Sequence, residues 1–315
     1  MVDKNRQGTD QPRRKTLKLM AGAGAGVGLG YLGWSSMSAN PGGANPAFDA
    51  NLLKQGPVYG GRIRVASLSI STADTLDPAK GALSTDYIRH NMLYSGLTQF
   101  TTDLSAIPAL AESWETDDQI AWRFKLRQGV EFHDGKPLTA DDVVYSLLRH
   151  KDPATASRAA AVATQFDAVS AEDSGMVLIQ LAGPNVDLPQ ILATSHFTII
   201  QNGTTDFRTA IGTGPYRLKD FTAGVRTIGS RNKNYWRNGK PYLEEIELIG
   251  IPDESARVNA LLSGDVHMVI AVNPRSIRRI NQTPGFAVKE TSSGNYTNLV
   301  LSLIHISEPT RPSQI

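Results

Sequence analysis

The most regular hydrophobic pattern in the chain is an alternation of apolar and polar positions in the segment AWRFKLRQGVEF. Trp122, Phe124 and Leu126 are separated by single polar residues, and this period of two predicts a half-buried strand. The sequence Arg-Gln-Gly then interrupts the pattern. Val130 and Phe132 resume it, which predicts a second, short strand.

A turn and a helix are predicted directly after these strands. Asp134-Gly135 is a strong turn dipeptide. Thr139 can cap a helix, and Asp141 and Asp142 lie in its first turn, where the helix dipole favours negative charge. The helix should bury one apolar stripe, formed by Val143, Val144, Leu147 and Leu148.

Strands and helices are also predicted along the rest of the chain. The strand patterns cover residues 60–66, 176–181, 198–201 and 242–248. The helical patterns cover residues 86–94, which Gly96 should end, 187–193, and a segment that opens at Glu254 and ends at Gly264. A further strand should begin after Gly264.

Composition removes several classes of function. The 315 residues suffice for one large domain or two ordinary ones. No cysteine is present, which excludes disulfides, thiolate metal sites and a thiol nucleophile. The formal charge is +2, but residues 1–38 contribute six basic and two acidic residues, a net of +4, so the remainder carries −2. The near-neutral remainder gives no electrostatic argument for nucleic-acid binding.

The N-terminus has the pattern of an export signal. A basic segment with the pair Arg13-Arg14 precedes a glycine-rich apolar run from Leu19 to Trp34. The paired arginines resemble a twin-arginine signal, which an export receptor recognises. The alternative is an uncleaved membrane anchor, for which the run is short and rich in glycine. We predict a signal peptide over residues 1–39, cleaved near Ser38 or Ala39, and a linker over 40–56.

Three blocks of sequence resemble the family 5 extracellular solute-binding proteins, which are receptors of ABC importers for peptides, nickel and related solutes. The first block comprises Ala111-Glu112-Ser113-Trp114, Trp122-x-Phe124-x-Leu126-Arg127, Gly129-Val130-x-Phe132-x-Asp134-Gly135 and Leu138-Thr139-Ala140-Asp141-Asp142-Val143. The second comprises Gly212-Thr213-Gly214-Pro215-Tyr216 and Arg231-Asn232-x-x-Tyr235-Trp236. The third runs from Glu254 to Met268.

The resemblance implies an α/β fold with mixed sheets, two lobes and a ligand cleft between them, like other periplasmic binding proteins. It further implies a periplasmic receptor that captures a small solute and delivers it to an ABC permease and ATPase complex. Peptide is the leading solute, followed by nickel complexes, opines or sugars. No cofactor is expected. The competing classes are an exported hydrolase and a non-transport chaperone or sensor on the same fold.

The resemblance also suggests ligand contacts. Ala82, Leu83 and Ser84 match the segment that runs beside a bound peptide in peptide-binding members, although the residues alone indicate an ordinary loop. Arg158 could meet an anionic group of the solute, because its planar guanidinium suits carboxylates. A solvated arginine is the alternative. In the second lobe, Asn295-Tyr296 is the candidate contact.

Other conspicuous residues are assigned structural roles. His133 beside Asp134 is expected to stabilise a turn, and Asp141-Asp142 to cap a helix, because adjacent helical residues do not face one point. The glycines of Gly212-Thr213-Gly214 predict a tight return to the first sheet rather than a phosphate cradle, since the spacing is not that of a nucleotide-binding loop. Neither close metal-ligand spacing among the six histidines nor a serine nucleophile elbow is present.

The end of the chain resembles something other than a protein. The run Leu301 to Arg311, LSLIHISEPTR, is similar to the direct translation of the transposase mosaic-end adapter used in sequencing libraries. We expect that the natural sequence departs near Val300 and that residues 301–315 are read-through. The first lobe would then span 57–272, and only the start of the second lobe, residues 273–300, would be present. Resequencing the locus across the Val300 codon checks this.

Overall fold

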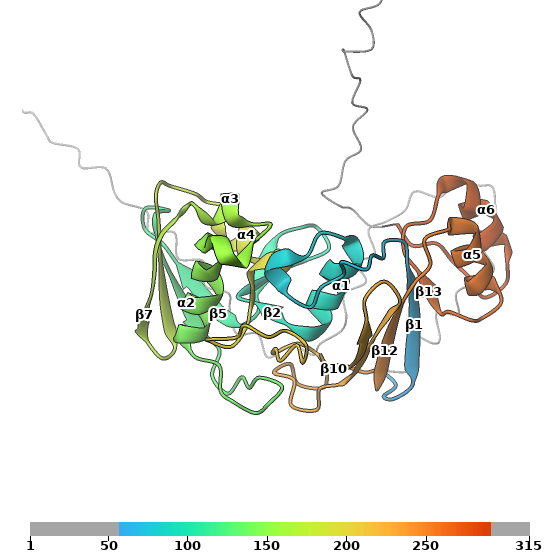
Figure 1. Cartoon of the computed structure of the whole chain (residues 1–315), viewed down its shortest axis with the longest axis horizontal. Coiled ribbons are helices and arrows are strands. Elements are labelled where there is room, and N and C mark those ends of the chain that lie inside the picture. Colours follow the sequence, from blue (N-terminus) through green and yellow to red (C-terminus); the bar gives the residue numbers. More distant parts are fainter. Residues whose placement is uncertain (1–56, 291–315) are drawn as a thin grey trace, which may run out of the picture.

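The computed structural model describes residues 57–290, whose helices and strands are arranged around two larger sheets (Figure 1). The predicted signal peptide, the linker, Asn295-Tyr296 and the adapter-like segment 301–315 lie outside the described residues. None of the helices between residues 57 and 290 is long and apolar enough to cross a membrane.

An antiparallel four-stranded sheet contains the segment with the strongest alternation. Its strands are β5 (Ala111–Glu115), β6 (Ala121–Leu126), β7 (Phe166–Asp173) and β8 (Met176–Leu181), in the order β5-β6-β8-β7. In β6, Trp122, Phe124 and Leu126 are buried while Arg123 and Lys125 are exposed, which confirms the predicted strand. Helix α2 (Ala140–Leu148) packs against this sheet and contributes to the same core.

The second strand predicted after β6 is wrong. Val130 and Phe132 are both buried as the alternation requires, but the segment forms only an isolated bridge between Glu131 and Pro137. The chain reverses at once, with Phe132 N donating to Lys136 O at 2.8 Å. Leu138 N also donates to Val130 O at 2.9 Å, but the chain turns at Gly129, which has a φ of 71°, so no further pair forms.

A mixed five-stranded sheet joins the start and the end of the described chain. Its order is β10 (Tyr216–Thr222), β11 (Arg226–Arg231), β12 (Glu245–Gly250), β1 (Arg62–Ser67) and β13 (Met268–Val269). Strand β1 runs parallel to β12 and β13, whereas β10, β11 and β12 are antiparallel. The expectation of an α/β fold with mixed sheets is confirmed.

Two helices cover a small core at the end of this sheet. Helices α5 (Glu254–Leu262) and α6 (Pro274–Gln282) pack together (Figure 1), and Ile280 of α6 is buried with Val258 and Leu261 of α5. Helix α6 falls in the stretch that we assigned to the start of the second lobe. The boundary near residue 272 stays a prediction.

Helix α1 (Ser84–Leu93) packs on the five-stranded sheet with Val65 and Tyr216. It ends at Leu93 because the chain becomes extended at Tyr94, and Gly96, which we expected to end it, belongs to strand β2 (Ser95–Gly96). The remaining elements are short: β3 (Thr98–Phe100), β4 (Ala106–Pro108), β9 (Thr198–Ile199), α3 (Ala160–Ala163), α4 (Leu188–Leu192) and the 3-10 turns η2 (Pro78–Lys80), η3 (Arg149–Lys151), η4 (Pro153–Thr155) and η5 (Ser195–Phe197).

The glycines before β10 permit a close approach to the end of α1. A Cβ atom on Gly214 would fall against the backbone of Met92 and Leu93, and one on Gly212 would fall against Leu93 O. The N–H of Gly214 donates to Leu93 O at 3.0 Å. The predicted tight return to the first sheet is therefore correct, and the engaged N–H is unavailable to a phosphate.

Candidate functional site

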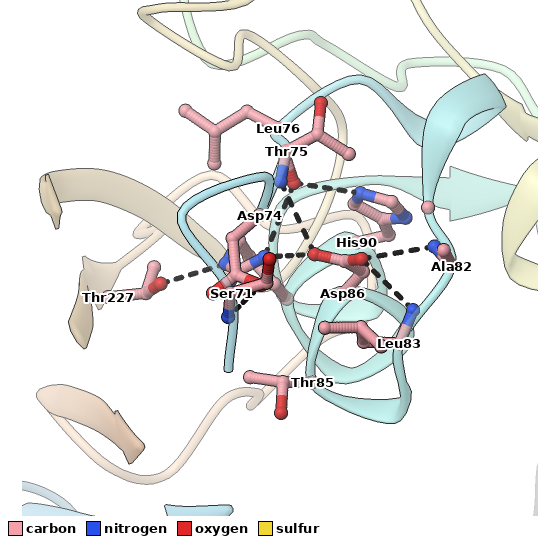
Figure 2. Close-up of polar contacts among 12 residues, drawn as sticks. Ser71, Asp74, Thr75, Leu76, Ala82, Leu83, Thr85, Asp86, His90 and Thr227 are labelled. Carbon is pink, nitrogen blue, oxygen red and sulfur yellow. Dashed lines mark hydrogen bonds and ion pairs between the residues drawn. The ribbon is translucent and has the colours of Figure 1, made fainter. Parts of the chain in front are cut away.

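The predicted ligand residues Ala82, Leu83 and Ser84 form the approach to helix α1, and Figure 2 shows Ala82 and Leu83 of this segment beside Asp86. Ala82 and Ser84 are exposed and Leu83 is half-buried. Leu83 occupies the N-cap position and Ser84 begins the helix. The loop is therefore a surface segment whose conformation is set by contacts underneath it.

Asp86 lies beneath this loop and binds its backbone N–H groups. Its Oδ2 atom accepts hydrogen bonds from Ala82 N at 3.0 Å and Leu83 N at 3.1 Å. Its Oδ1 atom accepts from Thr75 N at 3.3 Å, so one carboxylate connects the loop to the segment that precedes η2 (Figure 2). A carboxylate in the first turn of a helix can satisfy N–H groups that have no partner within the helix.

Arg89 neutralises this carboxylate inside the protein. The Arg89 side chain is 2% exposed and lies 2.5 Å from Asp86 Oδ1 and 3.2 Å from Asp74 Oδ2. It also donates to Thr227 Oγ1 of β11 at 2.8 Å, and its guanidinium stacks over the Phe221 ring. The loop is thereby anchored to the five-stranded sheet.

The ionisation states follow from burial and hydrogen bonding. Burial alone would raise the pKa of Asp86, but the N–H groups of Ala82, Leu83 and Thr75 and the charge of Arg89 together lower it below its usual value. His90 is fully buried, and burial lowers its pKa to about 4. At neutral pH the cluster thus contains a charged Asp86 and a neutral His90.

A second buried ion pair holds the preceding turn. Asp77 caps η2 by accepting from Ala79 N at 3.0 Å. Arg149, at the end of α2, donates to both Asp77 oxygens at 2.8 and 2.9 Å. This bidentate ion pair connects η2, which leads into the candidate loop, to the end of helix α2, which packs against the four-stranded sheet.

Arg158 is far from η2 in sequence and next to it in space. Its N–H donates to Ala79 O at 2.8 Å, while His196 Nε2 lies 3.0 Å from Gly81 O. The Arg158 side chain is exposed and forms no ion pair within residues 57–290. Of the predicted contacts, the structure thus brings Arg158 and the segment Ala82–Ser84 to one edge of the molecule.

Sequence reasoning missed His196 and two hollows beside this edge. A cavity of about 750 Å³ lies between η2 and α2, and one of about 650 Å³ adjoins it, sharing Thr75 and Phe207. Asp141, Tyr145 and Leu148 line the larger cavity, so Leu148, expected in the buried stripe, is instead 36% exposed. Asp141, Tyr145 and Leu148 follow an i, i+4, i+7 spacing, which places them on one side of a helix. This spacing could have predicted that α2 has a second face, which lines the cavity. His196 had no such signal.

The residues expected to be structural make structural contacts. His133 Nδ1 accepts from Gly212 N at 3.3 Å and its Nε2 lies 3.0 Å from Gly214 O. Asp142 accepts from Thr139 N and from Asn202 N, both at 2.8 Å. The described part of the chain contains no group of three or more His, Asp or Glu residues placed to hold a metal ion.

Comparisons with known proteins agree on one family. The family described as bacterial extracellular solute-binding proteins, family 5 middle, matches residues 105–305. The chain is 28% identical to the periplasmic murein peptide-binding protein MppA of Escherichia coli over 70% of its length. It is 31% identical to the oligopeptide-binding protein AppA of Bacillus subtilis over 67% of its length.

Solved structures share the fold. The structure of the binding protein AgaA with agropinic acid, from A. tumefaciens R10, covers 71% of this chain with a TM-score of 0.66 and 28% identity. The chain spans 46% of MppA, 41% of AppA and 46% of the AgaA chain.

Proposed function

The chain belongs to family 5 of the bacterial extracellular solute-binding proteins, and from this premise we propose that it is the solute receptor of an ABC importer. In this proposal it captures a small solute in a cleft between two lobes and delivers it to the permease and ATPase complex. The match of the family over residues 105–305 carries the proposal. Members of the family bind solutes and are not enzymes, so we assign this chain no catalytic role.

Peptide is the proposed solute. MppA and AppA are both named for peptide binding, whereas AgaA was solved with agropinic acid, so the fold accommodates solutes of different chemistry. Nickel complexes, opines and sugars remain the alternatives. Clefts of this kind bury most of a small organic ligand and close around it by a hinge motion.

One wall of the proposed site is the edge formed by Ala82, Leu83, Ser84 and Arg158. The exposed position of Arg158, three residues from a cavity-lining turn, supports a contact with an anionic group of the solute. Asn295 and Tyr296 are proposed for the opposite wall. The first lobe is proposed to span 57–272 and the second to begin at 273.

The proposed location is the periplasm. MppA is a periplasmic protein. The basic, glycine-rich N-terminus supports export by the twin-arginine machinery, followed by cleavage near residue 39 and a linker to residue 56.

Thermal denaturation with a peptide library tests the function. A bound peptide should raise the melting temperature, because a ligand that binds only the folded state stabilises it. The peptide should be recovered unchanged. Arg158→Ala should reduce the shift, whereas Arg123→Ala, which removes an exposed arginine paired with Glu172, should not. Peptide turnover would support the hydrolase instead.

The neighbourhood of the gene provides a second test. A transport receptor should be encoded beside two permease genes and two ATPase genes. Their absence, together with binding of unfolded proteins or a signalling output, would favour a chaperone or sensor on the same fold.

A further inference from the structure

The connection between strands β11 and β12 is basic and aromatic. The segment from Arg231 to Lys240, RNKNYWRNGK, contains four basic side chains and no acidic one. The sequence after residue 38, by contrast, carries a net charge of −2. Positive charge is therefore concentrated in this connection, which joins two neighbouring strands of the five-stranded sheet.

Two arginines lie over the ring of Trp236 in this connection. The guanidinium carbon of Arg237 is 4.6 Å from the centroid of the ring, and that of Arg127, directly after β6, is 5.2 Å from it. The ring is fixed in place, because its N–H donates to Ser95 Oγ at 3.3 Å and it packs against the core of the four-stranded sheet. Trp236 thus brings together two like charges from distant parts of the sequence, and the attraction of each cation to the ring offsets part of their repulsion.

These two arginines lack a counterion in the described part of the chain. Among residues 57–290, no carboxylate lies within 4.0 Å of either guanidinium. Arg127 Nε donates to Ala109 O at 3.2 Å, but the terminal NH₂ groups of Arg127 and the whole Arg237 side chain make no hydrogen bond within residues 57–290. Arg231, which lies over the Tyr59 ring, differs from them because Glu244 is 4.0 Å away.

The charges of Arg127 and Arg237 are only partly screened. Both side chains are half-buried, so water weakens their repulsion less than it would at an open surface. Burial lowers the pKa of Arg237 below its ordinary value, and the charge of Arg127 also lowers it. Because arginine stays protonated at neutral pH, two uncompensated positive charges share one ring. An anion that contacts both guanidiniums would relieve this repulsion.

The free donors favour a phosphate group. A guanidinium presents its N–H groups in a planar fork that matches two oxygens of a phosphate or a carboxylate. Two guanidiniums over one ring need acceptors that point in different directions. The oxygens of a phosphate form a tetrahedron and meet this need, whereas the two oxygens of a carboxylate lie in one plane.

We propose that Arg127 and Arg237 bind a phosphate group beside the Trp236 ring, at a site that contains none of the residues proposed to contact the solute. The phosphate belongs to inorganic phosphate or to the headgroup of an anionic phospholipid, since both present the same oxygens. Trp236 is a positioning residue for the two guanidiniums, because its own N–H group is already bound to Ser95.

Titration of the unmodified chain with sodium phosphate, followed by NMR at constant ionic strength, tests the site. The indole N–H resonance of Trp236, assigned with Trp236→Phe, should shift and saturate with phosphate but not with chloride. Arg237→Gln and Arg127→Gln should each weaken phosphate binding about tenfold or more, the factor that one charge-assisted hydrogen bond corresponds to. Lys233→Gln is the matched control, because it removes an exposed, largely screened charge from the same segment. It should change the affinity by less than about twofold.

Arg237→Gln is the decisive variant if Arg127→Gln does not fold, because the Arg237 side chain contributes only its contact with the ring. Flotation with phosphatidylglycerol vesicles then identifies the source of the phosphate. Vesicles that retain the unmodified chain but not Arg237→Gln would identify a lipid headgroup, and vesicles that retain both or neither would identify soluble phosphate. A Trp236 resonance that phosphate moves no more than chloride does would overturn the proposal. Equal losses of affinity in Arg237→Gln and Lys233→Gln would overturn it as well, because they would show a diffuse attraction in place of a site.

Discussion

Gly81, at the start of the candidate loop, has ordinary backbone angles but no space for a side chain. A Cβ atom there would lie 2.6 Å from Cε1 and 3.1 Å from Nδ1 of the fully buried His90 ring. We expect Gly81→Ala to lower the free energy of unfolding by about 1–3 kcal/mol, since a packed ring cannot move freely. Urea denaturation measures this. Gly183→Ala, where a Cβ meets nothing within 4 Å, is the control; equal stability of the two variants would refute the clash.

Buried histidines should make stability depend on pH in a defined window. Burial lowers the pKa of His90 and of His150 to about 4, from an ordinary value of 6.5. Below pH 6.5 the unfolded chain therefore binds protons that the folded chain does not, and the free energy of unfolding falls until pH 4. Between pH 7.5 and pH 5 we expect a loss of about 2 kcal/mol per histidine.

The variant His150→Gln identifies the contribution of one histidine. It should be less stable at pH 7.5, because His150 Nδ1 lies 2.7 Å from Ser157 Oγ, but it should lose less stability on acidification. Denaturant titrations at the two pH values measure the difference. The same pH dependence in the variant and the unmodified chain would show that His150 does not contribute.

At the scale of the element, α2 begins with two aspartates, of which one is buried and accepts hydrogen bonds while the other is exposed to solvent. Asp142 Oδ2 accepts from Thr139 N and Thr139 Oγ1, and its Oδ1 accepts from Asn202 N. The side chain of Asp141 is exposed and makes no hydrogen bond within residues 57–290. Thr139 occupies the N-cap position as predicted, and Asp142, three residues later, accepts from both its N–H and its hydroxyl group.

This asymmetry predicts the effect of two neighbouring substitutions. Asp142→Ala should cost about 1–3 kcal/mol of unfolding free energy, because it removes the acceptor of the Thr139 N–H and hydroxyl groups at the start of α2. Asp141→Ala should stay within about 0.5 kcal/mol of the unmodified chain. Chemical denaturation distinguishes them, and a larger effect at Asp141 would show that the solvent-facing charge matters more than the cap.

At the scale of the whole molecule, the position of α6 bears on where the first lobe ends. Ile280 is 1% exposed and shares a core with Val258 and Leu261. If α6 folds with the first lobe, Ile280→Ala should lower the stability of that lobe by about 2–4 kcal/mol. Arg278→Ala, at an exposed position of the same helix, is the control. An unaffected denaturation midpoint for Ile280→Ala would place the lobe boundary before α6, near residue 272.

Local patterns predicted the elements of this fold better than its site. Strand β6 could be predicted from its periodicity and the start of α2 from its capping residues, because residues close together in the sequence determine both features. Leu148 was misassigned because an apolar residue on a helix does not reveal which face meets the core. The contact of Gly81 with His196, and the pairing of Asp77 with Arg149, join residues 115 and 72 positions apart. Such pairs depend on tertiary packing that no local pattern encodes.

The parallel pairing of β1 with β12 has a consequence for how the chain folds. Val65 pairs with Leu248, so β1, the first strand of the described residues, has no partner until most of the described chain exists. The four-stranded sheet, by contrast, closes within residues 111–181. Non-local pairings form slowly because loop closure costs entropy before contacts compensate for it. We therefore expect the β5–β8 sheet to fold first during synthesis, while β1 stays unpaired and exposed to aggregation.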